Sequence, residues 1–273
     1  MNYHNDKWVM EQIERHYQFA TTLYKPEQIV GVFCQGSTNY GLDTKDSDID
    51  TKCIIVPSLE DIILGRKPVS TTHILDNNEH LDAKDIRLYI ETFRKQNLNF
   101  LEILFTPYYI LNPVYAAEWK RLMDSGEAIA HMNIVRAVKT MCGITKEKYY
   151  AMEHRYPIKV PIIDKYGYDG KQVSHLIRVN DYLKRYIAGE SYGACLYPSA
   201  GVRQRIMDYK ALDKIPLAEA RIEAAAYLKE TEEIVDNYCN GKEEYEDEKI
   251  RALLQEVGAN IIRTALKNEL MQT

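Results

Sequence analysis

Two closely spaced aspartates stand at the start of a strand-forming run in the stretch GSTNYGLDTKDSDIDTKCIIVP, which covers residues 36–57. Asp48 and Asp50 are separated by one residue, and alternate side chains of a strand point to the same side. Two carboxylates held together raise each other's energy unless a cation neutralises them. A hard divalent cation with oxygen ligands fits this need. The pair therefore predicts a metal site for Mg²⁺ (or Mn²⁺).

A Gly-Ser pair precedes these acids and directly follows a predicted strand. Gly36 would allow a ligand to approach the backbone closely, and the Ser37 hydroxyl with nearby N–H groups could hold phosphate oxygens. A phosphate-binding turn followed by a metal-binding acid pair is typical of phosphoryl or nucleotidyl transfer. The alternative is that Asp43, Asp46 and Asp48 are ordinary turn residues. We interpret Asp46 as an ordinary turn residue, because it lies in the loop before the strand.

The elements that must position these residues can be predicted from periodicity and composition. Apolar residues at helical spacing predict an amphipathic helix over residues 6–22. Runs rich in β-branched and aromatic residues predict strands over 29–34, 49–57, 69–75 and 79–82. A short helix is expected over 59–65, and Asp85 is a plausible N-cap for a helix over 86–96. This mixture is typical of a layered domain of strands and helices.

The character of the chain changes near residue 112. Four later stretches have helical period and composition: 116–154, 169–190, 217–238 and 249–270. Connections rich in Gly, Pro and Tyr separate several of them. We therefore predict a catalytic domain over residues 1–112 and a helical domain over residues 113–273.

Composition limits the classes of protein that fit. The chain has 273 residues and a net charge of −5, which argues against a surface built throughout for nucleic acid. Its five cysteines are scattered and form no Cys-x-x-Cys pair, so neither a zinc site nor a disulfide framework is indicated. The first residues lack the apolar core of a signal peptide, and no stretch is apolar enough to span a membrane. We expect a cytoplasmic protein without a membrane partner.

The stretch over residues 36–57 resembles the signature of the DNA-polymerase-β-like nucleotidyltransferase superfamily: Gly-Ser, then an acid-hydrophobic-acid triplet on the next strand. It looks most like the bacterial and phage branch whose members include proteins associated with RNA-repair operons. HLDAKDIRLYIETFRKQNLNFLEILF and GYDGKQVSHLIRVNDYL are similar to later segments of that branch. The resemblance implies an α+β fold, in which a mixed sheet with flanking helices forms the nucleotidyltransferase domain and an all-helical domain follows.

The resemblance also implies a third acid on a later strand, which completes one metal site and accepts the proton of the attacking hydroxyl or orients that hydroxyl. The candidates are Asp76, Glu79, Asp82 and Asp85. Asp82 is preferred because it ends a predicted strand and best matches the branch. Asp85 has a structural explanation as a helix cap, and Asp76 lies in a predicted turn.

A basic stripe lies on the predicted helix over residues 169–190. Lys171, His175 and Arg178 have helical spacing, while the apolar residues mostly occupy another face. Such a stripe could bind substrate phosphates. Lys would act as a point charge, and the planar guanidinium group of Arg would donate two parallel hydrogen bonds. An ordinary solvated helix face is the alternative.

Together these features predict a metal-dependent enzyme that binds an NTP, ATP included, and transfers the NMP to an acceptor hydroxyl with release of pyrophosphate. An RNA 3′ end is the first choice of acceptor, by analogy with the resembled branch. A protein hydroxyl and a small antibiotic-type molecule are the alternatives. A catalytically silent nucleotide-binding module is the non-enzyme alternative. The sequence leaves the oligomeric state and the preferred base undetermined.

Overall fold

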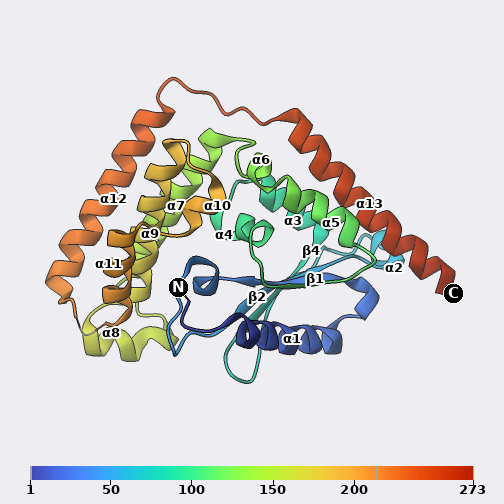
Figure 1. The fold of residues 1–273 in the computed structure, drawn as a ribbon, viewed down its shortest axis with the longest axis horizontal. Helices are drawn as coiled ribbons and strands as arrows, with labels where there is room; N and C mark the ends of the chain where they lie inside the picture. Colours follow the sequence, from blue (N-terminus) through green and yellow to red (C-terminus); the bar gives the residue numbers. More distant parts are fainter. Residues whose placement is uncertain (1, 213, 273) are drawn as a thin grey trace. The chain divides into compact units, whose positions relative to one another are not determined.

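A five-stranded mixed sheet organises the first part of the chain (Figure 1). Its strands are β1 (Ile29–Gln35), β2 (Asp50–Ile55), β3 (Ser70–Ile74), β4 (His80–Asp85) and β5 (Tyr109–Leu111). Their order is β3-β4-β2-β1-β5. The pair β2 and β4 is parallel, and the other neighbouring pairs are antiparallel. The predicted α+β architecture is confirmed.

This computed structural model describes residues 2–212 and 214–272. By its internal contacts the chain divides into unit 1, Met1–Asn133 with Glu246–Thr273, and unit 2, Ile134–Tyr245. Residues after 112 thus contribute to both units. The division into a catalytic domain over residues 1–112 and a helical domain over residues 113–273 stays a prediction.

Helices cover both faces of the unit 1 sheet. The helices of unit 1 are α1 (Asp6–Leu23), α2 (Leu59–Ile63), α3 (Ile86–Arg94), α4 (Leu98–Leu101), α5 (Ala116–Asp124), α6 (Gly126–Ala130) and α13 (Glu248–Gln272), with short 3-10 turns η1 (Pro26–Gln28), η2 (Ser37–Tyr40) and η3 (Glu102–Leu104). In Figure 1, α1 lies below the sheet, and α3, α5 and α6 lie above it.

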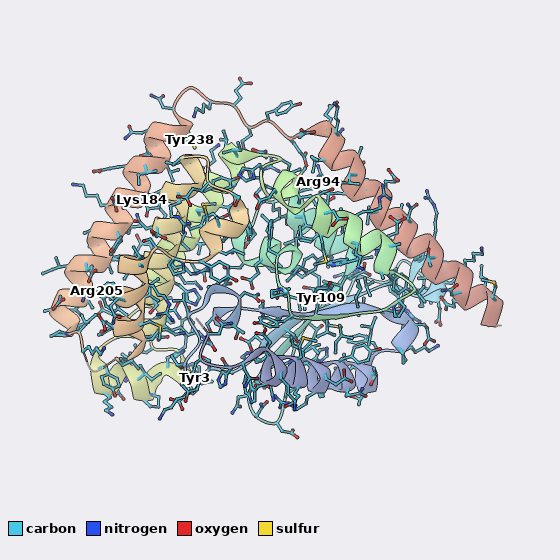
Figure 2. All side chains as sticks on the ribbon, in the orientation of Figure 1. Tyr3, Arg94, Tyr109, Lys184, Arg205 and Tyr238 are labelled. Atoms are coloured by element: carbon cyan, nitrogen blue, oxygen red, sulfur yellow. The ribbon has the colours of Figure 1, made fainter. Side chains whose placement is uncertain are left out.

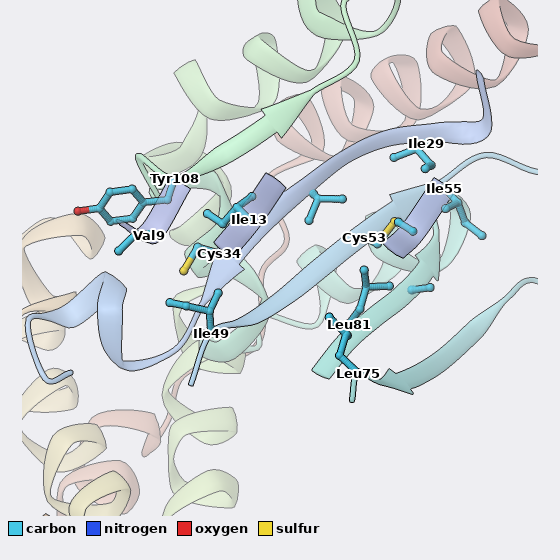
Figure 3. Close-up of a cluster of buried hydrophobic side chains, with 13 residues drawn as sticks. Val9, Ile13, Ile29, Cys34, Ile49, Cys53, Ile55, Leu75, Leu81 and Tyr108 are labelled. Atoms are coloured by element: carbon cyan, nitrogen blue, oxygen red, sulfur yellow. The ribbon is translucent and has the colours of Figure 1, made fainter. Parts of the chain in front are cut away.

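The side chains between α1 and the sheet form a hydrophobic cluster (Figure 3). Ile13 of α1 packs there with Cys34 of β1, Cys53 of β2 and Leu81 of β4, all of them fully buried. Because side chains alternate along a strand, the residues next to Cys53 and Leu81 must point to the opposite face. Lys52 and Asp82 are two of those residues, so the core on one face determines which polar groups lie on the other.

Unit 2 consists of helices in the part of it that the structure describes. They are α7 (Ile134–Ala151), α8 (Val160–Tyr166), α9 (Gly170–Ile187), α10 (Tyr192–Leu196), α11 (Ala200–Lys210) and α12 (Leu217–Cys239), with one 3-10 turn, η4 (Pro157–Lys159). Arg205 of α11, labelled in Figure 2, pairs with Glu219 and Glu223 of α12. Buried Asn180 of α9 donates a hydrogen bond to Thr231 of α12 over 3.0 Å.

The helix α13 belongs to unit 1 although unit 2 precedes it in the chain. Arg94 of α3, also labelled in Figure 2, forms a 2.7 Å ion pair with Glu246 just before α13. Arg121 of α5 pairs with Glu256 over 2.9 Å. The last helix therefore completes the layer that covers the sheet on the side away from α1.

Local sequence patterns predicted most of unit 1 correctly. The helix over 6–22 is α1, and the first predicted strands are β1 and β2. Asp85 caps α3 as expected, since its side chain accepts a 2.8 Å hydrogen bond from the N–H of Arg87. The strand β5 was not predicted. It has only three residues, and its pairing with β1 is a long-range contact that its own sequence does not specify.

Two expectations about chain chemistry can be compared with the structure. All five cysteines are free, and burial raises the pKa of Cys53 to about 12. Among the residues described, no helix has the length and apolar character required to cross a bilayer.

A buried polar cluster joins α1 to the start of β2. The His16 ring lies 2.8 Å from Thr51 Oγ1 through Nδ1 and 2.9 Å from Glu79 Oε2 through Nε2. Arg15 also contacts Glu79, and the N–H of Ile49 donates to Glu79 Oε1 over 3.2 Å. Ile49 lies between the two aspartates of the predicted metal site. The cluster therefore fixes the backbone on which those aspartates stand.

We predict that Glu79→Gln removes an acid-sensitive part of the stability. Burial opposes ionisation of Glu79, but the hydrogen bond with His16 and those from Asn77 and the Ile49 N–H outweigh it and lower its pKa from 4.5 to about 2. A lowered carboxyl pKa stabilises the folded state fully above pH 4.5 and loses that effect as the pH falls toward 2. At pH 7 the variant should lose about 2–3 kcal/mol of unfolding free energy.

Urea unfolding measured between pH 7 and pH 3 tests this. The difference between wild type and Glu79→Gln should shrink as the pH falls. The exposed Glu11→Gln in α1 is the matched control and should change stability by less than about 0.5 kcal/mol. If the difference in unfolding free energy between wild type and Glu79→Gln stays constant with pH, Glu79 does not stabilise the fold through its charge.

A second prediction concerns the contact of α9 with α11. A Cβ atom at Gly170 would lie 2.1 Å from the carbonyl oxygen of Tyr209, which is backbone and cannot rotate away. Gly170→Ala should therefore destabilise the protein by about 1–3 kcal/mol. At Gly143, inside α7, a Cβ atom meets nothing within 4 Å. Gly143→Ala should instead stabilise by about 0.5–1 kcal/mol, so unfolding curves of equal midpoint for the two variants would contradict this account.

Candidate active site

Carboxylates gather on the face of the sheet opposite α1. The parallel register of β2 and β4 places Asp82 beside Lys52, and Asp50 lies two residues before Lys52. Paired residues of neighbouring strands point to the same side, so Asp50, Lys52 and Asp82 share one face. The 2.6 Å contact between Lys52 Nζ and Asp82 Oδ2 shows this directly. Asp48 lies two residues before β2 and is exposed.

Asp50 has a neighbour that sequence reasoning missed. Its Oδ1 accepts a 2.9 Å hydrogen bond from the N–H of His80 and lies 3.1 Å from His80 Nδ1. His80 belongs to no recognisable motif in its local stretch of sequence. Only the register of β2 against β4, which is a tertiary feature, brings the two side chains together.

Asp82 is held by three polar side chains. Besides Lys52, the Thr72 hydroxyl donates to Asp82 Oδ1 over 2.5 Å, and Gln35 Nε2 donates to Oδ2 over 3.5 Å. Burial alone would raise the pKa of Asp82, but the Lys52 ammonium and these hydrogen bonds outweigh it and hold the pKa below its usual value. Asp82 is therefore ionised at neutral pH.

The other candidates for a third acid have different surroundings. Asp76 is exposed in the turn before β4. Glu79 is buried in the His16 cluster on the α1 side. Asp85 caps α3 and pairs with Arg87. Of the four, Asp82 is the one that shares a face with Asp50.

The Gly-Ser turn lies at the end of β1, next to the start of β2. Gly36 has φ of +91°, a conformation that L side chains rarely adopt, and a Cβ atom there would meet nothing within 4 Å. Its N–H donates a 2.9 Å hydrogen bond to Glu102 Oε1, so this donor faces the protein and not a ligand. The Ser37 hydroxyl is half-buried and has no hydrogen-bond partner within the described part of the chain. Ser37 thus supplies the side-chain donor of this turn.

Glu102 is a second residue that sequence reasoning missed. It is buried at the start of η3, where its carboxylate fixes the first residue of the Gly-Ser turn. One signal for it exists in the sequence, because it is the single acid within the apolar segment FLEILF. An acid in such a segment must be paired when buried.

The other acids of the opening stretch have separate positions. Asp43 is buried and accepts hydrogen bonds from the N–H groups of Tyr3 and His4 over 3.0 and 2.9 Å. It therefore anchors the N-terminal segment. Asp46 is exposed in the loop. Asp48 and Asp50 remain as the acids at the start of β2, the central strand of the sheet.

The predicted basic stripe lies on α9 in unit 2. Lys171 is exposed, His175 is half-buried and Arg178 is buried. Burial, together with the charges of Arg178 and Lys171, lowers the pKa of His175 well below 6.5. His175 is therefore neutral at pH 7, and the stripe carries its positive charge on Lys171 and Arg178.

The chemistry of the carboxylate face fits a hard divalent cation. Asp48 and Asp50 offer only oxygen donors, which Mg²⁺ prefers. Among the described residues, no three His, Cys, Asp or Glu side chains are close enough together to form a metal site by themselves. Asp82 is held by Lys52, so it would join a metal at Asp48 and Asp50 by exchanging that ammonium group for the cation.

Comparison with known proteins identifies the family of the chain. Residues 4–179 match the family described as the RNA repair pathway DNA polymerase beta family. The comparison with curated proteins gives no match. A crystal structure of a nucleotidyltransferase-like protein from Exiguobacterium sibiricum 255-15 aligns at 11% identity over 84% of this chain and 75% of that chain, with a TM-score of 0.26, which is too low to support an argument. The family match covers more than half of the sequence and includes the whole sheet, so the chain belongs to the RNA repair pathway DNA polymerase beta family.

Proposed function

We propose that this protein transfers an NMP unit from an NTP to an acceptor hydroxyl. One observation carries the proposal: Asp50 and Asp82 lie on one face of neighbouring parallel strands, next to the Gly36–Ser37 turn. The family supports nucleotidyl transfer in general. In the proposed step the acceptor oxygen bonds to the α-phosphorus, the bond from that phosphorus to the β-phosphate oxygen breaks, and pyrophosphate leaves.

The metal ligands would be Asp48 and Asp50, with Asp82 completing the site. The family generally uses a divalent metal ion with its NTP, and we propose Mg²⁺ or Mn²⁺. Such an ion neutralises the charge that develops on the phosphate oxygens. The Ser37 hydroxyl would hold the triphosphate, and Gly36 would let it approach the backbone.

Asp82 would share one metal ion and would orient or deprotonate the attacking hydroxyl of the acceptor. In the free protein, the Lys52 ammonium and the Thr72 hydroxyl stabilise the Asp82 anion and hold its pKa below the usual carboxyl value.

The helical part of the chain would contribute phosphate contacts. We propose that Lys171 and Arg178 of α9 supply positive charge and that neutral His175 supplies a hydrogen bond. The division into a catalytic domain over 1–112 and a helical domain over 113–273 stays part of the proposal.

An RNA 3′ end is the proposed acceptor. The support is the RNA repair pathway in the description of the family. The net charge of −5 slightly favours a protein hydroxyl or a small molecule over a long duplex as the acceptor. A protein hydroxyl, a small antibiotic-type molecule and a silent nucleotide-binding module are the outcomes that would replace it. The reaction is placed in the cytoplasm as part of the same proposal.

We predict that Asp48→Asn and Asp50→Asn each reduce transfer by about 10²-fold or more, since each removes a charge from the metal site. The measurement is transfer of label from each α-labelled NTP with Mg²⁺ to RNA, to lysate protein, or to neither. The matched control is the exposed Asp46→Asn, which lies in the same loop and should retain activity. Full transfer by either variant would refute the proposed metal site.

The same experiment separates the acceptor classes. Label on RNA in the wild type alone supports the proposed acceptor. Label on protein would show that the acceptor is a protein hydroxyl instead. Tight NTP binding with no transfer to any acceptor would indicate a binding module or a small-molecule substrate.

A further inference from the structure

A cavity of about 160 Å³ adjoins Asp82 on the side of the edge strand β3. Its lining includes Lys52, Asp82, Lys84, Phe100, Thr72 and Ser70. The volume is that of roughly five water molecules, which is ample for a phosphate group. All of these residues belong to unit 1.

The cavity has more positive than negative charge. Lys52 pairs with Asp82. Lys84 is half-buried and, within the described residues, contacts the rings of Phe100 and Tyr89 and no carboxylate. Two ammonium groups and one carboxylate give the cavity a net positive charge, which favours the binding of an anion.

Phe100 brings the two lysines together. Lys52 Nζ lies 4.4 Å and Lys84 Nζ 4.2 Å from the centroid of its ring. Such contacts with an aromatic face hold an ammonium group without neutralising it. The β3 edge adds hydroxyl groups, among them Ser70, which could donate to oxygens of the same anion.

We propose that this cavity binds a backbone phosphate of the RNA acceptor, with Lys84 as its main cation and Lys52 shared with Asp82. The proposal rests on the proposed function, because it places the acceptor beside Asp82. It assigns to Lys84 and the β3 hydroxyls a role that the transfer step itself does not require.

The order of the strands favours the acceptor over the NTP as the source of this phosphate. The Gly36–Ser37 turn, proposed to hold the triphosphate, follows β1. The cavity lies on the other side of β2, over β4 and β3. A substrate that approaches Asp82 from the β3 edge would cross Thr72, which pairs with Asp82, and would lie beside Lys84, two residues further along β4. The triphosphate would reach the acids from the β1 side.

The test is binding without turnover. A 5′-labelled single-stranded RNA with a free 3′ hydroxyl is titrated with protein in the absence of NTP at several salt concentrations, and ATP binding is measured separately by equilibrium dialysis. Lys84→Gln should weaken RNA binding about tenfold and lower the slope of log K against log salt by about 0.7. ATP binding should be unchanged.

Two further variants control for folding and for general charge. Lys84→Arg keeps the charge and should bind RNA within about threefold of wild type, which a merely structural loss would not allow. Lys67→Gln removes an equal charge from an exposed position between α2 and β3 and should leave RNA binding unchanged.

The outcomes are distinct from those of the transfer experiment, which reports on Asp48 and Asp50. RNA binding that is unaffected by Lys84→Gln, or absent in the wild type, overturns the proposal even if transfer occurs. Loss of ATP binding with RNA binding intact overturns it in favour of the NTP as the phosphate source. Transfer of label to protein overturns the choice of RNA. Selective loss of RNA binding supports the proposal even where no transfer is detected.

Discussion

The parallel pairing of β2 with β4 is the constraint on which the rest of the site depends. Its register places Lys52 beside Asp82 and His80 beside Asp50. Because the side-chain period of a strand is two, a shift of one residue would turn Asp82 into the core under α1 and expose Leu81. The fully buried Leu81 and Cys53 therefore secure the register through hydrophobic packing. That packing therefore determines the positions of the side chains on the polar face.

Charge on this face is balanced by contacts from several elements. Asp82 is ionised because Lys52 and Thr72 stabilise it, while Asp50 lies against His80. On the opposite side of the strand, Glu79 and His16 hold the backbone between Asp48 and Asp50. Each acid thus has its own surroundings. The same residue type serves as a cap, an anchor or a candidate metal ligand according to the partners that the fold provides.

The sequence predicted those features that depend on neighbours along the chain. Helical spacing identified α1, strand composition identified β1 and β2, and the cap Asp85 was recognisable from its position before an apolar helix. The signature resemblance pointed to Gly36, Ser37, Asp48 and Asp50. It could not show that Glu102 receives the N–H of Gly36, because the two residues are 66 positions apart. The partners of Asp50 and Asp82 depend on strand register, which no local pattern encodes. The three-residue β5 was missed for the same reason.

The position of α13 has a consequence for the order in which the protein is made. Unit 2 is continuous, so all of its contacts are available once Tyr245 has left the ribosome. Unit 1 begins earlier but lacks α13 until unit 2 has been made, so the contacts of α3 and α5 with α13 and the residues just before it are missing while unit 2 is translated. At ordinary rates of synthesis this interval lasts roughly 5–20 seconds. Synthesis of the unit that carries the carboxylates therefore starts before unit 2 and is completed after it.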